Sequence, residues 1–156
     1  MMAFAADYEV LFDRLDEVLR LAAVPAPDLF AKIIGCACVR IAVLGKAGKA
    51  HKIDRLLEAG AWTDAALALI ELELPAWKVR RVVYEDGGWL CSLSRQPNLP
   101  VEIDDTVDAS HDVLALAILR AFVETRRRIG VADRTISTVP RLTWARDTAI
   151  CCDNFA

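Results

Sequence analysis

The sequence lacks an excess of positive charge and a long apolar run. With 19 basic and 22 acidic residues among 156, its net charge of −3 does not give the basic surface typical of nucleic-acid-binding proteins. The longest apolar run, Ile33 to Gly45, has 13 residues and contains Arg40, whereas a membrane-spanning helix needs roughly 20. We therefore expect a protein with no membrane association.

The sequence also lacks the features of an exported, disulfide-bonded protein. Its five cysteines are odd in number, and four of them form two pairs that are too close in sequence for easy bridging: Cys36 with Cys38, and Cys151 with Cys152. The N-terminus has no basic segment, and its acidic residues begin at Asp7, so it does not have the pattern of a signal peptide. These absences favour a cytoplasmic location.

What is present is ample core material, at 55% hydrophobic residues, and a clear hairpin pattern from Trp77 to Leu93. Two β-rich runs flank Asp86-Gly87-Gly88, which supplies the positive φ angles of a short turn. The turn centre is either Asp86-Gly87 or Gly87-Gly88. Either choice puts the same residues on one strand face, and this face is the better candidate for the core: Val82, Tyr84, Trp89, Cys91 and Leu93.

Helical patterns surround this hairpin on both sides. Apolar spacing predicts helices over residues 8–23, 29–44, 63–74 and 110–128, with a short helical segment over 51–57. The β-branched residues leave a strand open as an alternative for 38–44. We expect an α+β fold in which an antiparallel β-hairpin packs with helices in α-β-β-α order. Its divisions are an N-terminal helical extension at 1–50, the module at 51–132 and a weakly structured C-terminal tail at 133–156.

Three short segments carry a resemblance to known proteins. They are Trp62–Leu67 ahead of Leu74-Pro75, the aromatic-flanked turn Tyr84–Trp89 and the helical segment Ala115–Leu119. In this order, residues 51–128 resemble a group of small uncharacterised bacterial proteins with a helix–hairpin–helix body, and are similar to phage-associated ABA-sandwich modules. The resemblance implies the fold and brings no established activity to particular positions.

One set of residues has the composition of a nucleophilic catalytic centre. Cys91, His111 and either Asp108 or Asp112 supply a thiol, an imidazole and a carboxylate. Cys91, however, falls on the predicted core face of the hairpin, where a small buried thiol is ordinary. We therefore expect no catalytic residues, and keep a thiol enzyme at Cys91 only as the weaker alternative.

Patterns for cofactors and metals are incomplete. The segment from Gly45 to Lys49 resembles the start of a phosphate-binding loop, but only two residues separate its glycines, and Ala50 stands where a hydroxyl is needed. Structural zinc spacing is absent among the cysteines and His51, and the acidic loop lacks a calcium-loop pattern at Asp104, Asp105 and Asp108. We predict no cofactor and no metal, and a solvated acidic loop that caps the next helix.

The helix predicted at 110–128 has more apolar surface than one core needs. A self-complementary interface is a common use for such a surplus, so we predict a protein interface at Val113, Leu116, Leu119 and Val123. The preferred function is a non-enzymatic protein-interaction module that self-associates as a homo-oligomer, through this helix or through the hairpin edge.

A local concentration of arginines gives the alternative function. Five arginines lie in the first strand of the predicted hairpin and at the end of the last predicted helix: Arg80, Arg81, Arg126, Arg127 and Arg128. Such a patch would suit a small nucleic-acid-associated accessory protein, although the acidic net charge opposes it.

Overall fold

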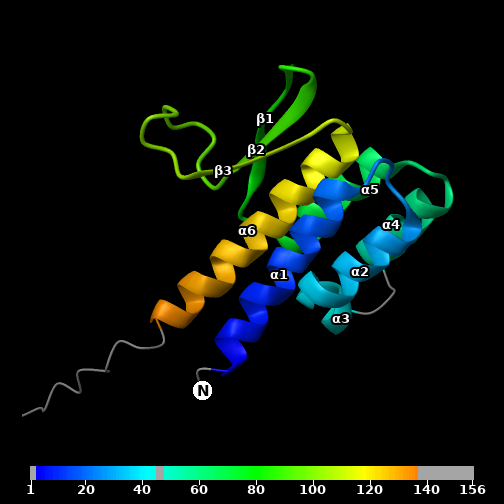
Figure 1. Cartoon of the computed structure of the whole chain (residues 1–156), viewed down its shortest axis with the longest axis horizontal. Coiled ribbons are helices and arrows are strands. Elements are labelled where there is room, and N and C mark those ends of the chain that lie inside the picture. The colour runs from blue at the N-terminus through cyan, green and yellow to red at the C-terminus, as the bar shows by residue number, and fades with distance from the viewer. Residues whose placement is uncertain (1–2, 45–47, 137–156) are drawn as a thin grey trace, which may run out of the picture.

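The chain folds as α+β, with helices packed against one antiparallel sheet (Figure 1). This computed structural model describes residues 3–44 and 48–136. The helices are α1 (Ala3–Leu21), α2 (Pro27–Ala37), α3 (Val39–Leu44), α4 (Lys49–Glu58), α5 (Trp62–Glu73) and α6 (Leu114–Ile136), and the strands are β1 (Lys78–Glu85), β2 (Gly88–Ser94) and β3 (Thr106–His111). Over these described ranges, no helix is long and apolar enough to cross a membrane.

The hairpin turn has its centre at Asp86-Gly87, the first of the two predicted arrangements. Asp86 has φ +52° and Gly87 has φ +83°, the two positive values that a type I′ turn requires. Glu85 pairs with Gly88, and Tyr84 pairs with Trp89, on the antiparallel ladder between β1 and β2. The turn therefore fixes the hairpin register.

A third strand, β3, was not predicted. It pairs antiparallel with β2 and completes the order β1-β2-β3 over residues that the sequence pattern placed in a loop and a helix start. Helix α6 consequently begins at Leu114 rather than at Ser110. The N–H of Val113 donates to Nδ1 of His111 at 2.9 Å, so the last residue of β3 satisfies a free donor just before the helix.

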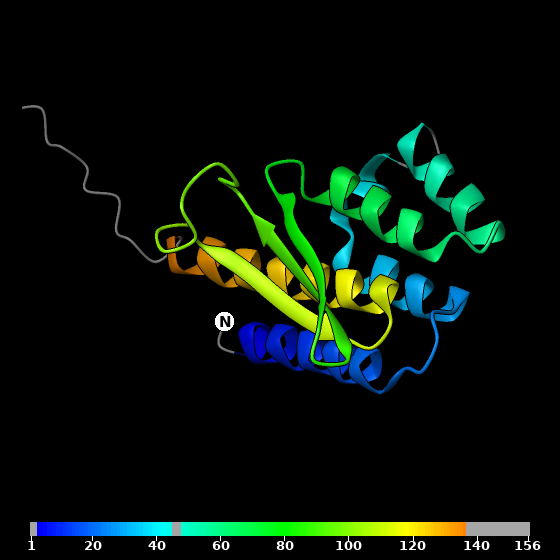
Figure 2. The same cartoon turned by 90° about the horizontal axis from the view of Figure 1, so that it is seen from above.

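Helix α6 lies at the centre of the molecule. It packs against β2 and β3 on one face and against α1 and α5 elsewhere on its surface. Figure 2 shows the sheet crossing α6, with α1 along one side of that helix and α5 on the other. A helix enclosed in this way must be apolar on several faces, which explains the surplus apolar residues seen in its sequence.

The N-terminal helices share the core of the rest of the chain. One cluster of buried residues includes Phe12 and Leu19 of α1 and Phe30 of α2, together with residues of the sheet and of α6. Within residues 3–44 and 48–136, no separate core therefore marks a boundary at residue 50. The predicted tail from residue 133 begins inside α6, and residues 137–156 lie outside the described part of the chain.

Close contact between α1 and α6 depends on a glycine. The hydroxyl of Tyr8 donates to the carbonyl oxygen of Arg126 at 3.0 Å, one turn before Gly130. A Cβ atom at Gly130 would overlap the phenol of Tyr8. The absent side chain therefore lets the tyrosine ring lie directly on α6.

The segment at 39–44 is helical, so its alternative as a strand is wrong. Helix α2 ends at Ala37, Cys38 is its C-cap residue, and the short helix α3 starts at Val39. The carboxylate of Glu73, which is buried, accepts the N–H groups of Arg40 at 3.1 Å and Ile41 at 2.7 Å. A side chain from α5 thus caps α3 from a distance and satisfies donors that its own sequence leaves free.

Only part of the predicted core face of the hairpin is buried. Cys91 and Leu93 of β2 are fully enclosed, and Trp89 packs against the edge of the core. In contrast, Val82 is 36% exposed and Tyr84 is 60% exposed, so the expectation of Tyr84 in the core is wrong. The five residues do share one face, but α6 covers β2 and β3 and leaves β1 largely uncovered.

Candidate functional site

The interface predicted on the last helix does not exist as a surface. Leu116, Leu119 and Val123 are buried within the chain, and Val113 is half-buried against the same core. The sheet, α1 and α5 already cover the faces of α6 that were assigned to a second subunit. This interface prediction is therefore wrong.

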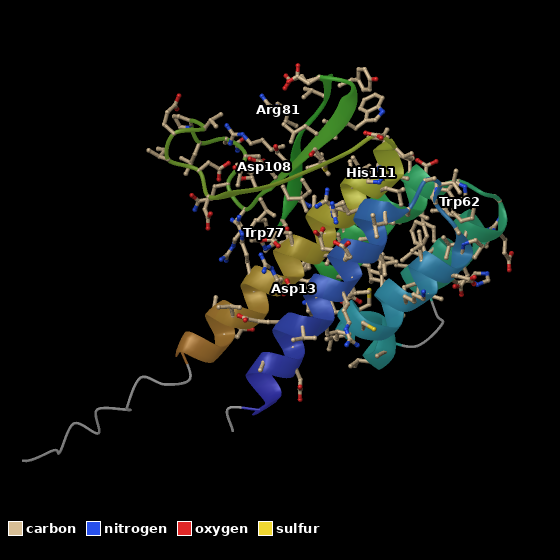
Figure 3. The ribbon with its side chains drawn as sticks, in the orientation of Figure 1. Asp13, Trp62, Trp77, Arg81, Asp108 and His111 are labelled. Carbon is tan, nitrogen blue, oxygen red and sulfur yellow. The ribbon has the colours of Figure 1, made fainter. Side chains whose placement is uncertain are left out.

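The three arginines of α6 do not form one patch. Arg126 donates to a backbone carbonyl of α2, Arg127 faces α1, and Arg128 reaches β3. Their partners are the carbonyl of Ala37 at 2.8 Å for Arg126, the carboxylates of Glu124 at 2.8 Å and Asp13 at 3.5 Å for Arg127, and the carboxylates of Glu124 at 3.3 Å and Asp105 at 3.6 Å for Arg128. Figure 3 shows Asp13 in the region where α1 and α6 lie together. The positive charges of Arg127 and Arg128 are therefore largely compensated inside the molecule.

Arg80 is also committed to an internal contact. Its guanidinium forms an ion pair with Asp104 and donates to the carbonyl of Leu99 at 2.7 Å. The hydroxyl of Ser94 donates to the same carboxylate at 2.6 Å. Asp104 is thus a buried anchor of the loop between β2 and β3, and its assignment to a solvated acidic loop is wrong. Of the predicted patch, only Arg81 is exposed without an internal partner among the described residues.

The suggested catalytic residues are not arranged for nucleophilic chemistry. Cys91 is enclosed in the core, and burial, with a smaller effect of the Asp108 carboxylate, raises the pKa of its thiol to about 11. Cys91 lies opposite Ala109 on the sheet, whereas His111 lies opposite Trp89 and accepts a backbone hydrogen bond. A protonated, buried thiol of this kind is a poor nucleophile.

The metal-ligating candidates are also dispersed. Cys36 is exposed, Cys38 is buried with a raised thiol pKa, and His51 is exposed on α4. In the parts of the chain that the structure covers, no three His, Cys, Asp or Glu side chains come together as a metal site. Cys151, Cys152 and residues 45–47 of the glycine–lysine segment lie outside those parts.

A hollow of about 420 Å³ lies beside the hairpin turn. Its lining includes Arg20 and Arg120 together with the acidic residues Glu85, Asp86 and Asp112. Both arginines are already paired, Arg20 with Glu17 and Arg120 with Asp16. The three acidic residues have no ion pair among the described residues, so the hollow has an acidic balance, but its carboxylates do not come together as a metal site in that part of the chain.

The two edges of the sheet differ, and this difference identifies the candidate site. At β3, Nη1 of Arg120 donates to the carbonyl of Ser110 at 2.6 Å, and Nη1 of Arg128 donates to the carbonyl of Thr106 at 3.2 Å. Eight residues of helix rise about 12 Å, and four residues of strand span about 13 Å, so the spacing of the arginines matches that of the carbonyls. Asp16 of α1 holds Arg120 in place at 2.8 Å. Side chains of α6 therefore cap two outward carbonyls of β3, those of Ser110 and Thr106.

The outer edge of β1 has no such cover. In an antiparallel ladder, the backbone groups of successive residues point alternately to the two sides of the strand. The carbonyls of Thr106 and Ser110 point away from β2, so the backbone groups of Trp89 and Cys91 hydrogen-bond to β3. Those of Leu90 and Ser92 therefore hydrogen-bond to β1. The residues of β1 opposite Trp89 and Cys91 are Tyr84 and Val82, whose backbone groups consequently point away from the sheet. Among the described residues, nothing hydrogen-bonds to these outward groups.

Sequence reasoning identified the hairpin but missed the contrast between its edges. The alternation of Val107 and Ala109 with polar residues was the available signal for β3. The chain matches no model of a known protein family, no curated protein and no solved structure. Resemblance to phage-associated modules therefore stays a prediction.

Proposed function

We propose that this protein is a non-enzymatic protein-interaction module that binds an extended segment of a protein partner along the outer edge of β1. The observation that carries this proposal is the asymmetry of the sheet. Arginines of α6 cap the carbonyls of β3, whereas the outward backbone groups of β1 have no partner in the described structure. Uncapped edges of this kind are templates for strand addition.

The side chains at this edge support the same use. Val82 and Tyr84 are the exposed apolar residues of β1, and their backbone groups are the ones that point outward. An added strand would satisfy those groups and would also cover the two side chains. Main-chain hydrogen bonds would supply affinity, and contacts with alternate side chains would supply selectivity.

Amide hydrogen exchange with a generic strand-forming peptide tests the proposal. The probe is a short capped peptide of alternating threonine and valine, and its matched control carries a central proline. We expect the first peptide to slow exchange at Val82 and Tyr84, and the second to leave it unchanged. Asp108, on the capped edge of β3, is the internal control. Unchanged exchange at Val82 and Tyr84 with a saturating probe would contradict the proposal.

A proline at the same edge gives the matching variant. Val82→Pro removes an outward N–H and leaves the ladder between β1 and β2 intact, which is the situation in which an edge strand tolerates proline. We expect it to reduce peptide binding by at least about tenfold, the factor that corresponds to one or two lost backbone hydrogen bonds. Asp108→Pro, on the other edge, should bind the peptide as the parent does.

A further inference from the structure

We infer that the partner strand is β1 of a second copy of this chain, added antiparallel so that Arg81 of each copy faces Glu85 of the other. This inference rests on the proposed function, because it uses the same free edge. It adds that the bound strand belongs to a second copy of the chain, and that pairs of Arg81 with Glu85 select one register of the two strands.

Only the half of β1 near the turn is suited to pairing. A bulge between Val79 and Arg81 interrupts the ladder, and Arg80 forms an ion pair with Asp104 of the loop between β2 and β3. Residues 81–85 continue the ladder regularly up to the turn. This segment belongs to the part of the hairpin that projects beyond the helices (Figure 1), and Figure 3 places Arg81 on it.

Backbone geometry limits how two copies can align. The outward groups belong to Val82 and Tyr84, so these residues must face each other or themselves across the new contact. Three symmetric registers satisfy this rule over residues 81–85. They place Val82 opposite Val82, Tyr84 opposite Tyr84, or Val82 opposite Tyr84.

The third register is the complementary one. It puts Val82 against Tyr84, so both exposed apolar side chains are covered on the helix-facing side. On the opposite face of the sheet, this register puts Val83 at the two-fold axis and Arg81 directly opposite Glu85. Opposite charges in directly facing positions stabilise an antiparallel pair. Because the axis is perpendicular to the sheet, the contact is isologous and each charge pair occurs twice.

The other two registers form neither the pair of Val82 with Tyr84 nor the pair of Arg81 with Glu85. With Val82 opposite Val82, Arg81 faces Val83 and Tyr84 faces Arg80. With Tyr84 opposite Tyr84, Val82 faces the acidic turn residue Asp86. Arg81 and Glu85 are both exposed and have no internal ion pair in the described structure, so their charges are available for the pairing that only the third register makes.

Single and combined charge reversals test this register by sedimentation equilibrium. The parent should dimerise in a concentration-dependent manner. Arg81→Glu places two acidic residues opposite each other in the homodimer, and Glu85→Arg places two basic residues there. Each change should weaken self-association by about tenfold or more, since it turns two attractive pairs into repulsive ones. Arg14→Glu and Glu71→Arg, on exposed helix positions, are controls for altered net charge and should dimerise as the parent does.

Mixing the two single variants gives the decisive result. In the mixed dimer, the introduced glutamate faces the introduced arginine, and native Glu85 faces native Arg81. We expect the heterodimer to form with an affinity within about threefold of the parent homodimer, and the double variant Arg81→Glu/Glu85→Arg to recover homodimerisation. A parent that stays monomeric, or a mixture that stays monomeric, would overturn the inference.

Failure of this inference is distinguishable from failure of the proposed function. If the generic peptide protects Val82 and Tyr84 while the charge variants do not redirect pairing, the edge binds strands but its partner or register is different. If the peptide gives no protection at Val82 and Tyr84 in protein diluted until the parent is monomeric, the proposed function itself is wrong.

Discussion

Replacing Asp104 by alanine should destabilise the protein by about 3 kcal/mol. The Asp104 side chain is 2% exposed, pairs with Arg80, and accepts the Ser94 hydroxyl at 2.8 and 2.6 Å. Removing one partner of a buried ion pair costs roughly 3–5 kcal/mol, because the remaining charge is left without compensation. The low end applies here, since Arg80 is 16% exposed and keeps its hydrogen bond to the carbonyl of Leu99.

A double-mutant cycle separates the cost of leaving one charge unpaired from the net contribution of the Arg80–Asp104 ion pair to stability. Arg80→Met should cost at least as much as Asp104→Ala, because it leaves the more deeply buried carboxylate unpaired. The double variant Arg80→Met/Asp104→Leu should lie within about 1 kcal/mol of the parent, since apolar replacement of a buried pair is often neutral. Ser94, which loses its acceptor, accounts for the small remaining cost.

Urea unfolding at pH 7, followed by far-UV circular dichroism and tryptophan fluorescence, measures these free energies of unfolding. A change of less than about 0.5 kcal/mol for Asp104→Ala would match an ordinary surface substitution. That result would refute the assignment of Asp104 as the anchor of the loop between β2 and β3.

Features determined by neighbouring residues could be predicted from the sequence. Apolar spacing indicated most of the helices, and Asp86-Gly87 indicated the hairpin. The α+β class that these signals predicted is confirmed. A type I′ turn needs two adjacent residues that tolerate positive φ, and this requirement is visible in the sequence alone. Helical periodicity is local in the same sense.

Strand β3 has a weaker local signal, the alternation of Val107 and Ala109 with polar residues. Its outward residues are polar, and the acidic residues Asp104, Asp105 and Asp108 resembled the capping loop of a helix. Thr106 to His111 is a strand because it pairs along the edge of β2 that lies opposite β1. The identity of β3 therefore depends more on pairing with β2 than on local preference.

The candidate site needed three-dimensional information for a related reason. The apolar pattern of Leu116 and Leu119 shows that several faces of the helix avoid water, but not whether another subunit or another helix covers them. Here α1 and α5 supply that cover, together with the sheet. Likewise, the sequence does not show that Arg120 and Arg128 cap β3, so it cannot indicate that β1 is the free edge.

Two further predictions test the burial on which these conclusions depend. Leu119→Glu should abolish cooperative unfolding by circular dichroism, because a carboxylate at this enclosed position costs about 4 kcal/mol or more, while Val18→Glu at an exposed position of α1 should unfold as the parent does. A folded, monomeric Leu119→Glu protein would restore the helix interface. In alkylation at pH 8 followed by peptide mapping, Cys36 should react rapidly and Cys91 slowly, because burial and the Asp108 carboxylate raise the Cys91 pKa to about 11. A raised pKa favours the thiol in the folded state, so this contribution to stability is complete below about pH 8.5, the pKa of an unfolded cysteine, and is lost as the pH rises toward 11. Equal labelling of the two cysteines in the native protein would show that the helix-facing side of the sheet is open to solvent at Cys91, and would contradict the burial of β2 on which the contrast with β1 depends.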